Sequence, residues 1–451
     1  MDSKNILQMP TSKAILHLAI PLIISQLLGT LYELTDTYFV GKISHESLAA
    51  VSISGTILFF VAAFISGLST GQLSIISRNM GKKEFEAASE SAMQGLSIGF
   101  FMSIFLGVVG YCTSDRMLVA LGAEGRVLSE GTDYLQILFL GTHAMFFLVL
   151  GNVIFQASGN TRTPLLVNIC SLTLNILLDW ILIFGKFGLP AMGVQGAAWA
   201  TVISRSFGAV VLLFLLADGK RQVHLKWAHV FPNFSIIKEM WRIGFPSSLQ
   251  ILVRSTSATI IMKIVADFGA ATIAAYGIGI RLFSIFLLPG FGLAGAACTL
   301  VGQNLGAKRI KEAERSMFLA SLYYFFLLFT LALFLFPFSS FWVSLFNQNE
   351  EVVTLGGTYL RYLTVAGLFL PIGVIYSRGL QTAGDAITPL LATILALYII
   401  QLPLAMLLPK HFMQDGIWMA RGIGISLHSF LAYVVFRLGR WKKRHLESAR
   451  S

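Results

Sequence analysis

The stretch Gln156-Ala-Ser-Gly-Asn-Thr-Arg-Thr-Pro164 is matched 225 residues later by Gln381-Thr-Ala-Gly-Asp-Ala-Ile-Thr-Pro389. At the same separation of 225, the motif Asn79-Met-Gly-Lys-Lys83 recurs as Asn304-Leu-Gly-Ala-Lys308. Ala49-Ala50 likewise matches Ala274-Ala275. A constant separation from residue 49 to residue 164, across more than a hundred residues, indicates an internal repeat. The sequence therefore predicts two halves that fold in the same way.

Each half consists mainly of apolar blocks that are long enough to cross a membrane. Of the 451 residues, 55% are hydrophobic and 12% are charged, whereas a soluble domain has about 25% charged residues. A helix of about 20 residues crosses the ~30 Å hydrocarbon core of a bilayer. The sequence predicts an all-α polytopic membrane protein with twelve transmembrane helices in two pseudo-symmetric six-helix lobes. We expect spans near residues 14–41, 47–77, 87–112, 130–155, 164–185, 193–217, 244–268, 271–301, 315–338, 355–380, 389–409 and 416–438.

The longest connection separates the two sets of six spans. We predict an N-terminal lobe over residues 1–217, a cytoplasmic linker over 218–242, and a C-terminal lobe over 243–451 that ends in a basic tail. An even number of spans in each half means that both halves enter the membrane from the same side. An axis along the membrane normal therefore relates the halves, as in parallel-repeat transporters.

The net charge of +11 follows the positive-inside rule and needs no nucleic-acid partner. Of the 33 Lys and Arg residues, 21 fall on the side of the N-terminus, 5 on the opposite side, and 7 within or at the ends of spans. This asymmetry predicts a bacterial-type inner (plasma) membrane protein with both termini in the cytoplasm. We expect no cleavable signal peptide, because the first ten residues are polar and the first apolar block runs on to full spanning length.

No motif of enzymatic chemistry is found in the sequence. A Ser-His-Asp set, a Cys-His pair and a nucleotide-binding loop are all absent, so we expect no enzyme and no organic cofactor. His17, His143 and His428 are isolated in spans and are interpreted as packing residues. The odd number of cysteines argues against a disulfide framework.

Carboxylates within the spans are the strongest functional signal. At ~1.5 Å of rise per residue, Asp36, Asp179 and Thr201 all lie roughly 8–12 Å below the outer boundary. Asn175 lies four residues before Asp179, on the same face of one helix. An ionisable group inside a membrane is expensive to bury and is by default a functional-site hypothesis.

Two carboxylates that share a dry site cannot both ionise cheaply, so the pair can take up a proton. The same oxygen-rich set also suits a hard cation such as Na⁺, and the sequence leaves both open. The positions 225 residues later are Ile261 and Leu404, so the second half does not repeat the charge. The alternative is that hydrogen bonds or a basic neighbour satisfy both acids structurally.

Other charged residues in the spans allow two interpretations. Glu33 is either a third coupling acid or a structural partner for a basic residue. Arg254 and Arg281 lie deeper and are candidates to face a cavity. For Arg254 the alternative is that helix carbonyls bind its guanidinium. Lys263 and Asp267 are four residues apart and are expected to form a local ion pair.

Four features carry a family resemblance: the repeat, the Pro21…Asp36 helix, the Asn-x-Gly loops and the Gln-Ala-Ser-Gly-Asn-Thr-Arg-Thr-Pro element. Together they resemble the multidrug and toxic compound extrusion (MATE) transporters, most closely their DinF-like branch. The resemblance implies two lobes that alternate between outward-open and inward-open forms. It implies export of an organic, often cationic, compound in exchange for H⁺ or, as a second choice, Na⁺. We expect a monomer among membrane lipids, with small-molecule drugs or organic cations as substrates.

The resemblance also assigns residues. The cation-coupling cluster falls on Asp36, Asn175, Asp179, Thr201 and the carbonyl of Ala197. Four of these, Asp36, Asn175, Asp179 and Thr201, are also the candidate ligands of Na⁺. Tyr32, Tyr134, Asn152 and Gln26 are assigned to the substrate cavity, and Pro21 to a bend of the first helix.

A second branch of the family has carboxylates in its seventh and tenth spans. Here the seventh span carries Gln250, Arg254 and Lys263, and the tenth carries Arg361 and Arg378 but no Asp or Glu, so sodium binding in the C-terminal lobe is not expected. The nearest alternative function is a lipid-linked glycan or lipid flippase of the same superfamily, which would need a strongly cationic cavity. An ion channel or a membrane scaffold fits less well, because no filter-like loop is present.

Overall fold

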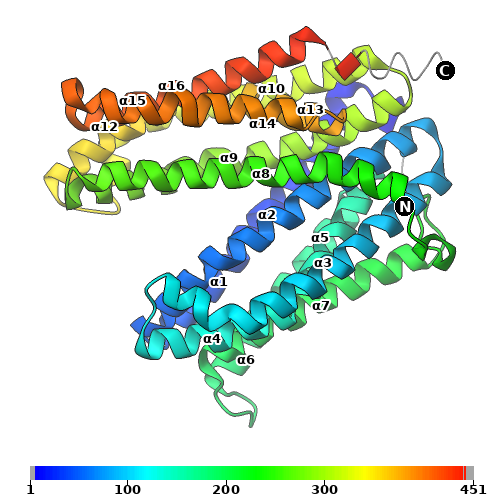
Figure 1. Cartoon of the computed structure of the whole chain (residues 1–451), viewed down its shortest axis with the longest axis horizontal. Helices are drawn as coiled ribbons and strands as arrows, with labels where there is room; N and C mark the ends of the chain where they lie inside the picture. The colour runs from blue at the N-terminus through cyan, green and yellow to red at the C-terminus, as the bar shows by residue number, and fades with distance from the viewer. Residues whose placement is uncertain (1–5, 440, 443–451) are drawn as a thin grey trace. The chain divides into compact units, whose positions relative to one another are not determined.

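The computed structural model describes residues 6–439 and 441–442, and all regular structure in this part of the chain is helical (Figure 1). The described residues divide into two compact units. The first unit contains residues 24–248, and the second contains residues 6–23 and 249–442. The basic tail predicted after Lys442 lies outside the described residues.

The first unit is a bundle that begins in the middle of one helix and ends in the middle of another. α1 (Thr11–Gly41) starts in the second unit and ends in the first, and α8 (Phe234–Ala266) starts in the first and ends in the second. Between them lie α2 (His45–Lys82), α3 (Phe85–Ala120), α4 (Gly125–Leu140), α5 (Thr142–Ala157), α6 (Arg162–Phe184), α7 (Gly193–Ala217) and the short 3₁₀ helix η2 (Trp227–Val230).

The second unit has the same plan with more interruptions. Its elements are η1 (Ile6–Gln8), α9 (Ala270–Gly306), α10 (Ile310–Leu335), α11 (Ser339–Ser344), α12 (Glu350–Gly367), α13 (Leu370–Thr382), α14 (Ile387–Ile394), the π-helical stretch η3 (Leu395–Gln401), α15 (Leu402–Leu407) and α16 (Pro409–Leu438).

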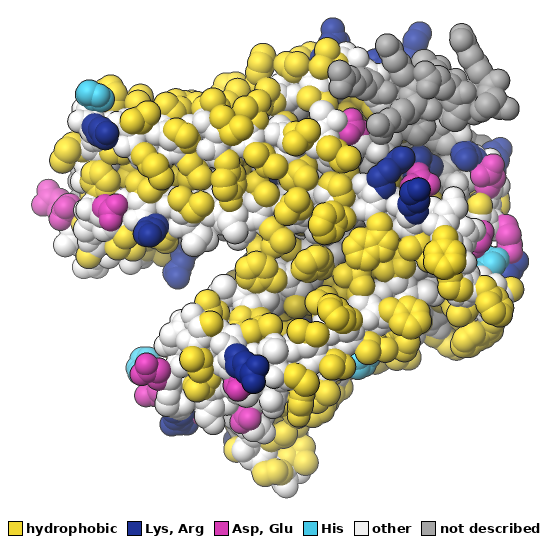
Figure 2. Space-filling view, viewed as in Figure 1, with side chains coloured by type: hydrophobic (Ala, Val, Ile, Leu, Met, Phe, Trp, Pro, Cys, Tyr) yellow, Lys and Arg dark blue, Asp and Glu magenta, His cyan; other side chains and the backbone are white. Residues whose placement is uncertain are grey.

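Twelve membrane spans follow from these helices. Ten helical stretches are long and apolar enough to cross a bilayer, and α14, η3 and α15 together count as one of them. Two bent pairs complete the set, namely α4 with α5, bent by 50°, and α12 with α13, bent by 48°. Figure 2 shows hydrophobic side chains over the flanks of the helices and charged side chains mostly near their ends. The predicted fold class is therefore confirmed.

The helices of the two units pack in the same pattern. In the first unit, α2 packs against α3, α4 and α5, and in the second α9 packs against α10, α12 and α13. Likewise α7 packs against α4, α5 and α6, as α16 does against α12, α13 and α15. The repeat in the sequence is thus a repeat of tertiary structure.

The repeated motif that opens the sequence forms the same turn in both units. Gly159 has φ +89° and Gly384 has φ +90°, a region that favours glycine because it has no Cβ. After each glycine a side-chain oxygen caps the next helix. Asn160 Oδ1 accepts from the Thr163 amide at 3.1 Å, and Asp385 Oδ1 accepts from the Thr388 amide at 3.3 Å.

The connection predicted over residues 218–242 is partly helical, because α8 begins at Phe234. Hydrogen bonds and an ion pair hold the part of the connection before Phe234 against α3. The Gln94 side-chain amide donates to the carbonyls of His229 and Phe231 at 2.7 Å each, and Lys226 Nζ lies 2.6 Å from Glu86 Oε2. The connection is therefore an ordered part of the first unit.

Candidate functional site

Asp36 lies in the part of α1 that belongs to the first unit, and it contacts α7. Its side chain is 8% exposed, and its Oδ2 accepts a hydrogen bond of 3.0 Å from the Thr201 hydroxyl. Figure 1 shows this part of α1 near α4, α6 and α7. The common depth of Asp36, Asp179 and Thr201 requires the first, fifth and sixth spans to be neighbours. They are neighbours in the structure.

Asn175 and Asp179 approach the same carboxyl group from α6. Both are completely buried, and both interact with Asp36. Among the described residues, neither oxygen of Asp179 and neither polar atom of the Asn175 amide has a hydrogen-bond partner, and the same is true of Asp36 Oδ1. Buried polar atoms without partners are costly. A proton shared by the carboxyls, or a hard cation among these oxygens, would satisfy the oxygens but not the Asn175 amide nitrogen, which only donates.

Thr201 and Ala197 lie one helical turn apart on α7, and both are buried. Thr201 contacts the acid pair directly through its hydroxyl, whereas the role of the Ala197 carbonyl stays a prediction. The set of oxygens and one amide suits H⁺ or Na⁺ but contains no His or Cys. No group of three or more His, Cys, Asp or Glu side chains placed to hold a metal ion occurs among residues 6–439 and 441–442.

A second layer of polar residues joins the cluster to the middle of α7. The Tyr32 hydroxyl donates to the Thr201 carbonyl at 3.3 Å and lies 2.5 Å from Ser204 Oγ. The guanidinium of Arg205 lies 5.4 Å from the centre of the Tyr32 ring, a cation–π distance. The sequence analysis missed Ser204 and Arg205, although they follow Thr201 by three and four residues and so share its face of the helix.

Arg205 does not neutralise the acids through an ion pair. It acts electrostatically on Asp36 and on the exposed Glu33, but no ion pair within 4.0 Å joins it to either acid in the described part of the chain. The structural alternative named two ways to satisfy the acids. A basic neighbour lacks the contact that it requires, and the hydrogen bond from Thr201 reaches only Asp36 Oδ2.

The residues assigned to the cavity occupy different surroundings. Tyr134 on α4 is buried and interacts with Asp36, Tyr32 and Asp179, so it borders the cluster. Asn152 on α5 donates instead to Asn168 Oδ1 at 3.4 Å. Gln26 is exposed on α1, with no described side-chain contact to the acids.

Pro21 is buried within α1, which continues as one helix through it. Proline cannot donate the backbone hydrogen bond of a helix interior, so α1 is weakened at this residue. The bend that the resemblance assigns to Pro21 stays a prediction.

The corresponding region of the second unit has the opposite charge. Arg254 Nη2 lies 2.9 Å from Nε2 of the buried His428, and Arg378 acts on Arg254 from α13. Because an arginine only donates, His428 accepts. Arg254 therefore has a histidine partner rather than the helix carbonyls that were considered, and His428 is more than a packing residue. Arg281 is exposed on α9.

The prediction of an ion pair between Lys263 and Asp267 is wrong. No such pair within 4.0 Å is found where the structure describes the chain. α8 ends at Ala266, so Asp267 lies beyond the last helical turn and loses the i, i+4 geometry.

The chain resembles known transporters over nearly its whole length. The MatE family model matches residues 21–181 and 246–407. The probable multidrug resistance protein NorM of Thermotoga maritima is 27% identical, over 96% of this chain and 93% of that protein. The protein of the same name from Agrobacterium fabrum is 30% identical, over 97% and 96%. A crystal structure titled as MATE in the bent conformation has a TM-score of 0.91 and 25% identity, and it covers 99% of this chain and 100% of that chain.

Proposed function

Because the chain belongs to the MatE family, we propose that it is a multidrug efflux antiporter that exports organic, often cationic, small molecules in exchange for entering protons. The relatives and structural neighbours are transporters, so the chain is an integral membrane transporter and the prediction that it is no enzyme is confirmed. We place it in a bacterial inner membrane as a monomer, with both termini in the cytoplasm. The DinF-like branch stays a prediction.

The observation that carries the proposal is the buried acid pair of Asp36 and Asp179 with its unpartnered oxygens. Two carboxyl groups in contact in a dry environment repel each other when both are ionised, and one proton removes the repulsion. Proton binding is therefore strongly linked to the conformation that holds the two groups together. A ligand shifts a conformational equilibrium only by its difference in affinity for the two states.

The helix that carries Asp36 offers a path from protonation to movement. α1 carries Asp36 in its second half and the weak position at Pro21 in its first half. We propose that protonation changes the contact of Asp36 with α6 and α7, and that α1 responds by bending at Pro21. A similar solved structure is described as bent, and this description suggests a bend here.

The test is transport by the full chain in proteoliposomes. With an acidic outside and no sodium present, ethidium export should follow the imposed pH gradient and should stop when a protonophore collapses it. A sodium gradient at equal pH on both sides is the matched control. Export driven only by sodium would contradict the proton assignment while leaving the transport function intact.

A further inference from the structure

A groove runs along the surface of the second unit between α10, α12, α13 and α16. It consists of two neighbouring cavities of about 970 and 980 Å³. Ile372 and Tyr433 line both cavities, so the two form one continuous groove. Its residues lie far from the acid cluster in sequence and belong entirely to the second unit.

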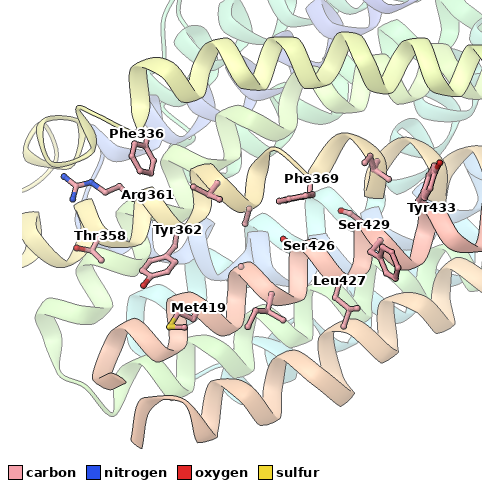
Figure 3. A pocket seen from close by; sticks show the side chains of 16 residues that line it. Phe336, Thr358, Arg361, Tyr362, Phe369, Met419, Ser426, Leu427, Ser429 and Tyr433 are labelled. Atoms are coloured by element: carbon pink, nitrogen blue, oxygen red, sulfur yellow. The ribbon is translucent and has the colours of Figure 1, made fainter. Parts of the chain in front are cut away.

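Most of the surface that lines the first cavity is apolar, although Thr358, Arg361 and Ser426 also line it (Figure 3). Along α16 it extends from Met419 to Tyr433, which at 1.5 Å per residue is roughly 21 Å. This length matches one extended acyl chain better than a compact drug. Its apolar lining includes Phe336, Val365, Phe369, Ile423, Leu427 and Phe430.

The second cavity is basic. It is lined by Lys311, Arg315, Arg437 and Lys442, against Glu314 as its one acid. Lys442 pairs with Glu314, and Arg315 Nη1 lies 3.7 Å from Glu312 Oε1. Lys311 and Arg437 are exposed and have no ion pair among the residues that the structure describes. At least two cations at this end are therefore open to an anion.

We propose that this groove binds an anionic phospholipid. The phosphate contacts Lys311, Arg315 and Arg437, and one acyl chain passes Tyr433 and lies along α16 in the apolar cavity. Basic pockets between transmembrane helices near a membrane surface recognise anionic headgroups, whereas a choline headgroup brings its own positive charge. The amphipathic Tyr433 stands at the junction, where the environment changes from polar to apolar.

Native mass spectrometry of the purified full chain in detergent tests the proposal. The probes are palmitoyl-oleoyl phosphatidylglycerol and the phosphatidylcholine with the same chains. We expect one retained phosphatidylglycerol per chain and weaker retention of phosphatidylcholine. The double variant Lys311→Gln/Arg437→Gln should weaken phosphatidylglycerol binding roughly 30-fold, from about 1 kcal/mol for each basic residue at a membrane surface.

A matched control and a steric variant separate the possible causes. Lys238→Gln/Arg242→Gln removes two exposed cations from α8 and should leave binding unchanged. Ser426→Trp fills the apolar cavity and should weaken phosphatidylglycerol binding even though every cation remains. Equal retention of the two lipids by the unmodified protein would overturn the proposal without any variant. So would binding of glycerol 3-phosphate as tight as that of the lipid, because the groove would then be only a phosphate site.

Discussion

The two units share a scaffold but differ in the charge that they bury. In the first unit, Asp36 and Asp179 meet between α1, α6 and α7. In the second, the positions 225 residues later are Ile261 and Leu404, and the half-buried Arg254 pairs with the buried His428. Helix packing and turns were retained after duplication, whereas the electrostatics diverged.

From this difference we expect cation binding in one half only. A site lined by unpartnered carboxyl oxygens attracts H⁺ or a hard cation. A site that contains two guanidinium groups and a histidine that accepts from one of them repels it. We therefore expect a proton to be bound in the first unit only. Four experiments with substituted chains test the contrast, from the largest expected effect to the smallest.

Removal of either acid should have the largest effect. Asp36→Asn or Asp179→Asn keeps the size of the side chain but removes the ionisable group, so export driven by a pH gradient should fall at least about 100-fold. The measurement is ethidium export from proteoliposomes, with the exposed Asp115→Asn as the matched control. A variant that keeps full gradient-driven export would show that its acid is structural.

Arg254→Gln probes the second unit. Loss of the charged donor to the buried His428 should lower the free energy of unfolding by about 1.5–3 kcal/mol. Dependence of export on the pH gradient should persist, because no proton is bound there. Thermal unfolding in detergent and the proteoliposome assay report the two effects. Loss of gradient dependence with unchanged stability would break the comparison.

Thr201→Val removes one hydrogen bond to Asp36 without changing the shape of α7. A net loss of about 1–1.5 kcal/mol corresponds to a roughly five- to tenfold fall in the export rate. Thr201→Ser retains the hydroxyl and is the matched control. Equal activity of the valine and serine variants would exclude a role for the hydroxyl.

The repeated turn should respond equally in both units. Gly159→Ala and Gly384→Ala each place a Cβ at φ near +90°, and each should cost about 1–2 kcal/mol of unfolding free energy. Thermal unfolding of the two single variants measures this. A large difference between them would mean that the two turns do not contribute alike to stability.

The repeat and the membrane spans could be predicted from the sequence. The length of each apolar block and the constant separation of the repeated motifs can both be read directly from it. The breaks at Gly141 and at Leu368–Phe369 were missed, since hydrophobicity continues through both bent pairs. The η3 stretch was missed for a similar reason: no residue in Leu395–Gln401 is a proline or a glycine.

The acid cluster was also predictable in part. Depth and spacing placed Asp36, Asp179 and Thr201 at one level, and the structure brings them together. Arg205 was recognisable as a charge inside a span, but its position over Tyr32 depends on how α1 meets α7. The bond between Arg254 and His428 joins residues 174 apart, and no local pattern reveals such a contact.

The π-helical η3 corresponds to residues 170–176 of α6, the stretch that contains Asn175 and precedes Asp179. A π-helix closes its hydrogen bonds from i to i+5, so each turn holds more residues than an α-helical turn. Residues after η3 therefore emerge at a different angle from their counterparts in α6. Protein engineers who introduce aspartates at 261 and 404 should not recover a second acid pair, because the π-helical stretch turns the residues after it relative to their counterparts in α6. The second half differs from the first in helical geometry as well as in charge.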